Sequence, residues 1–294
     1  MLQQLSAEEL PKVEKEISDF INTYTSHEEL KKSMLYSIEA GGKRLRPLII
    51  LATVKAFQKE LTTPVYQTAG ALEMIHTYSL IHDDLPAMDD DDLRRGKLTN
   101  HKVFGDALAI LAGDGLLTGA FQLLSETTLS PSETVLLIQL LAKAAGIGGM
   151  VAGQAGDMAA EKNQIPLKDL QAIHHRKTGA LLTYAFVAGG ILANQTEYVA
   201  ELLETLGGHI GLAFQIRDDL LDIVGTTEEL GKQIGQDEKS EKSTYPSLLE
   251  LEGARQALAD ELGQAKIVIH QLAEVAEFQP QIFEELLTLF DLEK

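Results

Sequence analysis

Cysteine and tryptophan are both absent from the 294-residue sequence, and proline occurs only eight times. Without cysteine, the chain has no disulfides, no thiolate nucleophile and no sulfur ligands for zinc or an iron–sulfur cluster. Two phosphate-binding patterns are missing too, because neither GxxxxGK[ST] nor GxGxxG after a strand occurs. The sequence therefore argues against a P-loop or a Rossmann dinucleotide site.

Positive charge is scarce: Lys and Arg number 25 against 44 Asp and Glu, a formal net charge of −19. A surface for duplex nucleic acid needs clustered Lys and Arg, so we expect no nucleic-acid partner. The N-terminus lacks the basic and apolar regions of a signal peptide. The longest apolar run, residues 181–193, is too short for a membrane span. We therefore expect a cytoplasmic protein without such a span.

The apolar pattern is helical along almost the whole chain, and strand signals are nearly absent. It predicts one all-α domain, residues 1–294, of about ten helices. Glycine pairs at 148–149 and 189–190 suggest close helix–helix approach. The polar stretch 231–246 is interpreted either as a solvated loop or as a mobile lid. The predicted helices are 44–58, 65–82, 105–125, 133–150, 167–192, 198–224, 247–275 and, shorter, 279–290.

Residues 81–96, IHDDLPAMDDDDLRRG, contain six aspartates followed by two arginines. Asp83 and Asp84 come at the end of a predicted helix. Pro86 interrupts the regular backbone, so Asp89 can return beside Asp83. The other three aspartates, Asp90, Asp91 and Asp92, have no assigned role beyond a solvated face or partners for the arginines.

A second acidic cluster lies inside the apolar helix 198–224. Asp218 and Asp222 are four residues apart and project from one face, next to Asp219. Buried carboxylates need a cation. Arg217 and other bases could supply it in a structural network. Two such clusters favour a hard cation instead, and magnesium fits best because it takes few carboxylates and completes its shell with phosphates. Calcium competes, but no EF-hand spacing occurs, and no Glu-x-x-His motif supports a di-iron bundle.

Several basic residues stand out against the acidic background, and the first two groups each have a structural alternative. The bases of GGKRLRP, 41–47, follow two glycines and suit an anion at a helix start, or are simply solvated. The adjacent arginines of the first acidic cluster can fork onto phosphate or pair with the preceding aspartates. Further bases occur in HHRKTG, 174–179, and in the 231–246 stretch. The candidates are Lys43, Arg44, Arg46, Arg94, Arg95, Arg176, Lys177, Lys232, Lys239 and Lys242.

Five motifs follow one another along the chain: GGKRLRP, DDLPAMDDDDLRRG, GQAGD, KTG, and FQIRDDLLD followed by GK. With this ordered set the chain resembles the trans-prenyl diphosphate synthases, or polyprenyl synthetases, most closely those of the bacterial farnesyl type. The resemblance runs from about residue 41 to the loop before 246. It implies an all-α bundle around a deep central cavity, a homodimer, and three magnesium ions bound together with substrate.

The resemblance also implies roles for individual residues. The metal ligands would be Asp83, Asp89, Asp218 and Asp222, and the catalytic set would be Asp83, Asp84, Asp89, Lys177 and Asp218. The allylic diphosphate would contact Arg94, Lys177, Thr178, Gln215, Lys232 and Lys242. Isopentenyl diphosphate would contact Lys43, Arg46, His76 and Arg95. His76 is seven residues before Asp83 and so shares its helical face, although a helical histidine is more often structural.

The implied reaction joins isopentenyl diphosphate head to tail to dimethylallyl diphosphate and then to geranyl diphosphate, through ionisation, condensation and elimination. Tyr78, five residues before the first aspartate, with Ser79 beside it, is expected to stop the chain at fifteen carbons. Alternatively, Tyr78 only packs in the core.

Three rival functions remain: a geranylgeranyl diphosphate synthase, a non-catalytic subunit that binds prenyl diphosphates, and a class I terpene cyclase. The second motif, DDLLD, argues against a cyclase, which should carry an Asn/Ser/Glu motif there. Many relatives have a basic C-terminal tail, but this chain ends FDLEK and Lys294 is given no role.

Overall fold

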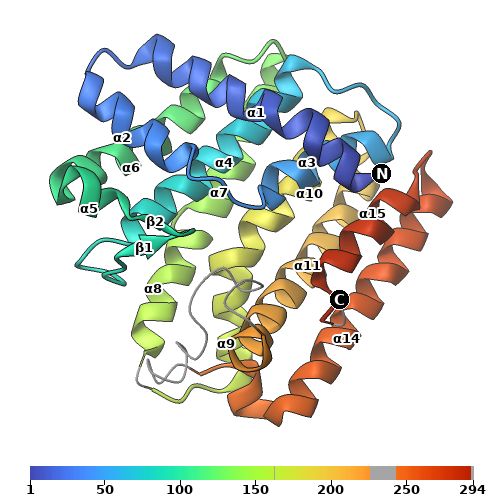
Figure 1. Cartoon of the computed structure of the whole chain (residues 1–294). Coiled ribbons are helices and arrows are strands. Elements are labelled where there is room, and N and C mark those ends of the chain that lie inside the picture. The colour runs from blue at the N-terminus through green and yellow to red at the C-terminus, as the bar shows by residue number, and fades with distance from the viewer. Residues whose placement is uncertain (162, 226–242, 293–294) are drawn as a thin grey trace. The chain divides into compact units, whose positions relative to one another are not determined.

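The computed structural model describes residues 1–161, 163–225 and 243–292, and nearly all regular structure in them is helical (Figure 1). The all-α prediction is confirmed. The α-helices are α1 Leu2–Tyr24, α2 Glu28–Ile38, α3 Leu45–Ala56, α4 Thr63–Asp83, α5 Asn100–Phe104, α6 Asp106–Ser125, α7 Pro131–Ala145, α8 Met150–Ala160, α9 Leu167–His174, α10 Ala180–Leu192, α11 Glu197–Val224, α14 Tyr245–Val275 and α15 Pro280–Leu287.

The chain divides into two compact units, each made of separate stretches of sequence. The first, here called the N-unit, comprises Gln3–Leu51 and Leu61–Gln139. The second, the C-unit, comprises Met1–Leu2, Ala52–Glu60 and Leu140–Lys294. The N-unit carries the first aspartate cluster and the C-unit carries the second. That the whole chain forms one domain stays a prediction.

Helix α4 is the centre of the N-unit. Thr62 precedes it and Pro64 lies in its first turn, where a missing N–H costs nothing. Most of its side chains are buried, Leu72 completely. It packs against α6, whose Gly113 leaves room for the ring of His82 near the end of α4. This buried helix fixes the position of the residues that follow it.

A two-stranded hairpin in the N-unit was not predicted. Strands β1 (Leu93–Arg94) and β2 (Lys97–Leu98) pair antiparallel around a turn at Arg95 and Gly96. Both turn residues have positive φ, 55° and 76°. Tight hairpins of this kind usually take Asn-Gly, and here an arginine occupies the first position. Arg94 lies on strand β1 and Arg95 in the turn, so the hairpin gives these two adjacent arginines different orientations.

In the C-unit, α10 and α11 pack closely through small residues. A Cβ on Gly190 would lie 2.5 Å from a methyl carbon of Leu203, and one on Gly207 would lie 2.6 Å from the Cα of Thr183. The expectation for the glycines at 189–190 is therefore confirmed at Gly190. The expectation for 148–149 is wrong: those glycines form the turn between α7 and α8, and Gly149 faces the carbonyl of Ala144.

The predicted helix 167–192 is interrupted. Residues His175–Gly179 form a π-turn between α9 and α10, and this turn contains the KTG motif. Wider hydrogen bonding of this kind is rare and is often found at functional sites. Because of this π-turn, the side chains of Lys177 and Thr178 project in other directions than they would from a continuous α-helix.

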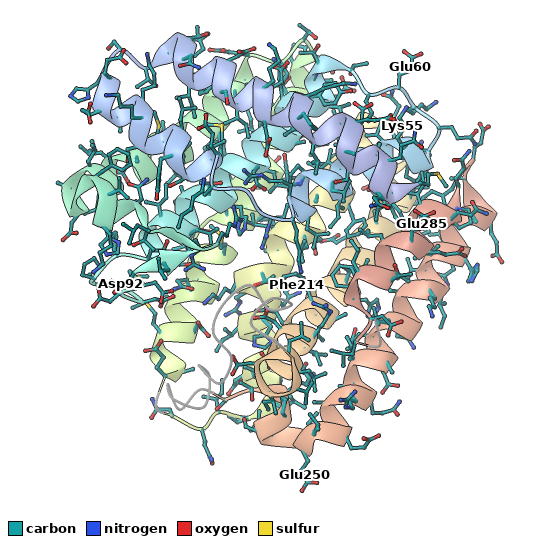
Figure 2. All side chains as sticks on the ribbon, viewed as in Figure 1. Lys55, Glu60, Asp92, Phe214, Glu250 and Glu285 are labelled. Atoms are coloured by element: carbon teal, nitrogen blue, oxygen red, sulfur yellow. The ribbon has the colours of Figure 1, made fainter. Side chains whose placement is uncertain are left out.

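Helix α14 begins two residues before its predicted start because Thr244 and Ser247 form a reciprocal capping box. Its path bends at Glu250, whose φ of 60° is not helical. Figure 2 shows Glu250 at this bend, with its side chain directed outward. Helix α15 packs beside α14 (Figure 1). The ring of Phe278, just before α15, also packs at a tilt against the ring of Phe57, which follows α3.

Two apolar stretches among the described residues are long enough to cross a membrane by length and composition alone, 106–125 and 131–160. They were not singled out by the sequence analysis, which considered 181–193. The second is not continuous, since α7 ends at Ala145 and α8 starts at Met150. Core helices of water-soluble proteins pass the same test. The expected absence of a span, like the cytoplasmic location, stays a prediction.

Candidate functional site

The first aspartate cluster begins where α4 ends. After Asp83 the chain turns tightly, with the amides of Met88 and Asp90 both donating to the carbonyl of Leu85. The amide of Asp89 then donates to the carbonyl of Asp83 at 2.9 Å. The prediction that Asp89 returns beside Asp83 is confirmed. The two residues proposed as metal ligands are thus neighbours, joined by a backbone hydrogen bond across the turn.

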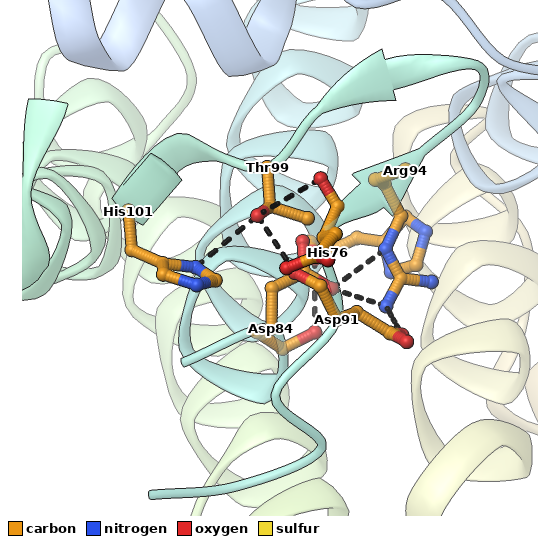
Figure 3. Close-up of polar contacts among 8 residues, drawn as sticks. His76, Asp84, Asp91, Arg94, Thr99 and His101 are labelled. Atoms are coloured by element: carbon orange, nitrogen blue, oxygen red, sulfur yellow. Dashed lines mark hydrogen bonds and ion pairs between the residues drawn. The ribbon is translucent and has the colours of Figure 1, made fainter. Parts of the chain in front are cut away.

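Asp84 and Arg94 form a tight ion pair (Figure 3). Nε of Arg94 donates to Oδ1 of Asp84 at 2.8 Å, Nη2 donates to the same oxygen, and Nη2 also reaches Asp91 at 3.3 Å. Burial alone would lower the pKa of Arg94, but the hydrogen bond and charge of Asp84 outweigh it and raise that pKa. Of the two alternatives for Arg94, phosphate binding or pairing with the preceding aspartates, this structure shows the pairing.

The aspartates that had no role anchor the hairpin to its surroundings. Lys102 forms an ion pair with Asp92 at 2.7 Å, and the hydroxyl of Thr99 donates to the carbonyl of Asp91 at 2.7 Å. His101 contacts the same hydroxyl (Figure 3). The carboxylate of Asp92 is largely exposed, as Figure 2 shows. These contacts hold the segment in place and need no metal.

The GGKRLRP motif divides into structural and functional parts. Arg44 is buried and donates to Glu73 at 2.6 Å, to Glu14 at 3.0 Å and to the carbonyl of Ile38. Its guanidinium is therefore hydrogen-bonded to groups of the protein, which favours a structural role over ligand binding. Neither glutamate was a candidate in the sequence analysis, because nothing in the local pattern links residues 14 and 73 to residue 44.

Arg46, His76 and Arg95 gather close to this buried ion pair. Nη1 of Arg46 lies 3.2 Å from Nε2 of His76. Because arginine only donates, Nε2 must accept, so the ring proton is on Nδ1. Burial, followed by the charges of Arg46 and Arg95, lowers the pKa of His76 well below its ordinary value. The imidazole is therefore neutral at physiological pH.

The carboxylates near Arg46 and Arg95 do not fully compensate the cost of burying these two arginines. Burial lowers the pKa of Arg46 to about 10, and Glu73 only partly offsets the effect. Nε of Arg46 is buried and has no hydrogen-bond partner among the described residues. A small cavity of about 30 Å³, lined by Asp84, Arg94 and Arg95 among others, lies in the same unit. An incoming anion would satisfy these cations. Lys43 is exposed at the chain surface.

The second aspartate cluster lies near the end of α11 in the C-unit. Asp219 and Asp222 are 8% and 3% exposed, and Asp218 is less deeply buried. The amide of Tyr245, at the start of α14, donates to Oδ2 of Asp219 at 2.9 Å. Asp219 thus joins α11 to α14. Asp218 and Asp222 stay the predicted metal ligands of this helix.

The π-turn of the C-unit brings three more candidates into contact with neighbours. Nζ of Lys177 lies 2.6 Å from Oδ2 of Asp157, the last residue of GQAGD. The hydroxyl of Thr178 donates to Oε1 of Gln215 at 3.1 Å. Asp157 was not predicted from the sequence to be a functional residue. Lys232 and Lys242, and most of the 231–246 stretch, lie outside the described residues.

The carboxylates fit magnesium by their chemistry. Within residues 1–161, 163–225 and 243–292, no three His, Asp or Glu side chains converge as a ready-made metal site. Magnesium does not need one, because it takes one or two carboxylates and fills its octahedral shell with water and substrate phosphates. The paired Asp83 and Asp89, and separately Asp218 and Asp222, offer such donors.

The proposed chain-length residues, Tyr78 and Ser79, lie on α4 five and four residues before its end. Tyr78 is 6% exposed, and its ring meets that of His82 edge-on at 5.7 Å. The hydroxyl of Ser79 donates to the carbonyl of His76 at 2.9 Å. Tyr78 is held by packing, which leaves its expected role as a steric stop untested.

The likeness to known proteins extends over most of the chain. The Polyprenyl synthetase family matches residues 27–278. The farnesyl diphosphate synthase of Bacillus subtilis is 52% identical over 264 residues, 89% of each protein. Geranylgeranyl pyrophosphate synthase 4 of Arabidopsis thaliana is 46% identical over 77% of this chain and 62% of its own length. The crystal structure of geranyltransferase from Helicobacter pylori, complexed with magnesium and isoprenyl diphosphate, is 31% identical, with a TM-score of 0.82 over 93% of both chains. The chain belongs to the polyprenyl synthetase family.

Protonation of His174 is expected to couple stability to pH. Its ring packs 6.0 Å from that of Tyr245, and burial, with Lys177 adding to it, lowers its pKa to about 4. Between pH 6.5 and 4 the unfolded chain therefore binds a proton that the folded chain does not, so stability falls as the pH drops. Acidification should lower the free energy of unfolding, and we expect this decrease to be roughly 2–3 kcal/mol smaller in His174→Phe than in wild type. Urea unfolding at pH 7 and pH 4.5 measures this difference.

The exposed His270 gives the matched control. His270→Gln should keep the wild-type dependence on pH. An equal loss of stability in wild type and His174→Phe would show that the buried histidine does not carry the effect.

Proposed function

We propose that this protein is a farnesyl diphosphate synthase. It condenses isopentenyl diphosphate with dimethylallyl diphosphate and then with geranyl diphosphate. The 52% identity to the Bacillus subtilis enzyme, over 89% of both proteins, carries the proposal. The residues of both aspartate clusters and the neighbouring bases support it, because they offer oxygen ligands for a divalent cation and donors for diphosphate.

The chemistry needs no protein nucleophile. The allylic C–O bond breaks, the electron pair leaves with diphosphate, and the double bond of isopentenyl diphosphate attacks the resulting cation. Loss of a proton then forms the new double bond. Magnesium, three ions in our proposal, neutralises the leaving diphosphate when it is bound. The chain's own part is to hold the two diphosphates and exclude water.

The two diphosphates would be held by different groups. Arg46 and Arg95, with Lys43 and the neutral His76, would bind isopentenyl diphosphate. Burial lowers the pKa of Arg46 and of Arg95, and Glu73 only partly offsets it, which favours an anionic ligand. Lys177, Thr178 and Gln215 would contact the allylic diphosphate. Arg94, which pairs with Asp84 in this structure, is a further proposed contact of the allylic diphosphate. Lys232 and Lys242 complete the proposed allylic set.

One incubation tests the reaction. Purified protein with isopentenyl diphosphate, either allylic starter and magnesium should give farnesyl diphosphate by chromatography, and excess chelator should abolish it. Asp218→Asn should lower turnover by at least about a hundredfold, because it removes charge stabilisation at the leaving group. Asp260→Asn, an exposed position on α14, should behave like wild type. Turnover in excess chelator, or geranyl diphosphate as the end product, would contradict the proposal.

Product length would be set by Tyr78 and Ser79. The ring of Tyr78 is buried on α4 and braced by His82, so it cannot move aside easily. A rigid aromatic ring on the path of the growing chain would stop it at fifteen carbons. The similarity to the Arabidopsis geranylgeranyl synthase keeps a twenty-carbon product as the second candidate, at lower identity and coverage.

Replacing the ring tests this assignment. Tyr78→Ala should shift the product to twenty carbons or more, because the removed ring leaves space for another isoprene unit. Tyr198→Ala, at a position 56% exposed, is the control and should keep the farnesyl product. Chromatography of the dephosphorylated products reads the length. An unchanged fifteen-carbon product from active Tyr78→Ala would show that Tyr78 only packs in the core.

We also propose a homodimer. In the N-unit, α6 and α7 expose large apolar side chains: Ile110 is 43%, Leu111 53% and Val135 63% exposed. A second copy of the chain would bury such surfaces. Sedimentation should give a species of twice the chain mass, and Leu111→Lys should favour the monomer. A wild-type monomer at micromolar concentration would contradict this.

A further inference from the structure

The GQAGD motif, residues 153–157 within α8, has no role in the proposed reaction. It lies in the C-unit together with the π-turn His175–Gly179, and α8 packs directly on that turn. The turn carries Lys177 and Thr178, which the proposed function places on the allylic diphosphate. A π-turn is less favourable than a regular helical turn, so neighbouring groups must hold it.

Two glycines approach the backbone of the turn. A Cβ on Gly153 would collide with the backbone nitrogen of Lys177 and lie 2.5 Å from its Cα. A Cβ on Gly211 of α11 would lie 2.7 Å from the Cα of Gly179. In both cases the opposing atoms are backbone, which cannot rotate away. Two helices therefore fit against the turn only because these positions have no side chain.

Asp157 acts on the side chain of the same turn. It is four residues after Gly153, so both project from one face of α8. Its Oδ2 lies 2.6 Å from Nζ of Lys177, and the side chains are only 20% and 27% exposed. A lysine ammonium sits on a flexible stem with several rotamers, and this ion pair restricts it to one direction.

We propose that Gly153 and Asp157 of the GQAGD motif are positioning residues for Lys177. Gly153 and Gly211 fix the backbone of the π-turn, and Asp157 orients the ammonium that receives the allylic diphosphate. This rests on the proposed function of Lys177. A competing effect has the opposite sign, because the charge of Asp157 also repels a diphosphate. Positioning predicts that removing that charge weakens binding, whereas repulsion predicts tighter binding.

Asp157→Asn separates these effects while keeping the shape of the side chain. We expect the KM for geranyl diphosphate and the Kd for its unreactive thiolo analogue to rise by roughly tenfold. The KM for isopentenyl diphosphate should change less than about twofold, and Tm should stay near wild type. Asp157→Glu should recover part of the loss. Tighter binding of the analogue, or an equal rise in both KM values with a lower Tm, would overturn the proposal.

A double-mutant cycle shows whether Asp157 acts through Lys177. Lys177→Ala should weaken binding of the analogue at least as much as Asp157→Asn. If the carboxylate works by orienting the ammonium, adding Asp157→Asn to Lys177→Ala should change Kd by less than about twofold. Independent, additive losses would show that Asp157 contacts the ligand or its ions by another route, which contradicts the assignment.

The glycines are tested against a matched position on α11. Gly208 has open space where its Cβ would be, so Gly208→Ala should leave kinetics unchanged. Gly211→Ala, three residues on, and Gly153→Ala should displace the turn, lower kcat and raise the KM for geranyl diphosphate more than that for isopentenyl diphosphate. Wild-type kinetics in either variant would contradict the proposal that Gly153 and Gly211 fix the backbone of the π-turn.

Measurements on the wild-type protein distinguish a failure of the positioning role from a failure of the proposed enzymatic function. Absence of both turnover and analogue binding in the wild-type protein would refute the proposed function. Normal turnover and binding in wild type, with the same values in Asp157→Asn, would refute only the positioning role.

Discussion

The buried carboxylate of Glu73 pairs with Arg44 and partly offsets the charges of Arg46 and Arg95, and so makes the arrangement of these bases possible. It binds Arg44 directly and lowers the cost of keeping Arg46 away from water. Arg44 in turn holds the end of α2 through the carbonyl of Ile38 and reaches Glu14 on α1. Arg44 therefore connects α1, α2 and α4 through two ion pairs and one backbone contact, and it fixes the loop before α3 that carries Lys43. A buried pair of this kind gives geometry more than stability, because desolvation offsets most of its attraction.

Much of the fold followed from the sequence, because long amphipathic and apolar helices have a period that survives tertiary packing. The return of Asp89 to Asp83 was predictable as well, since a proline soon after a helix end forces a compact turn. Contacts between distant residues were not predictable. The partnership of Arg44 with Glu73 and that of Lys177 with Asp157 depend on which helices meet, and no local spacing encodes this.

Local structure was missed where a residue took an unusual conformation. The hairpin lacks Asn-Gly, and its turn uses Arg95 with positive φ because Gly96 follows and strand pairing compensates the strain. The π-turn has no sequence signature of its own. It exists because Gly153 and Gly211 admit the backbone on two sides. The residues that escaped prediction thus lie beside the candidate site, where packing overrides intrinsic preference.

The π-turn also limits how the length of this part of the chain can vary. Each residue advances an α-helix by about 100°, so a wider turn acts like one residue inserted into a regular helix. Deleting one residue between His175 and Gly179 would therefore restore regular α-helical winding and leave the buried faces of α9 and α10 directed much as they are. Deleting one residue inside α9 or α10 themselves would instead rotate the residues beyond it by about 100°. The π-turn is thus the place in this part of the chain where the loss of one residue preserves helix packing, while the backbone of Lys177 and Thr178 would move.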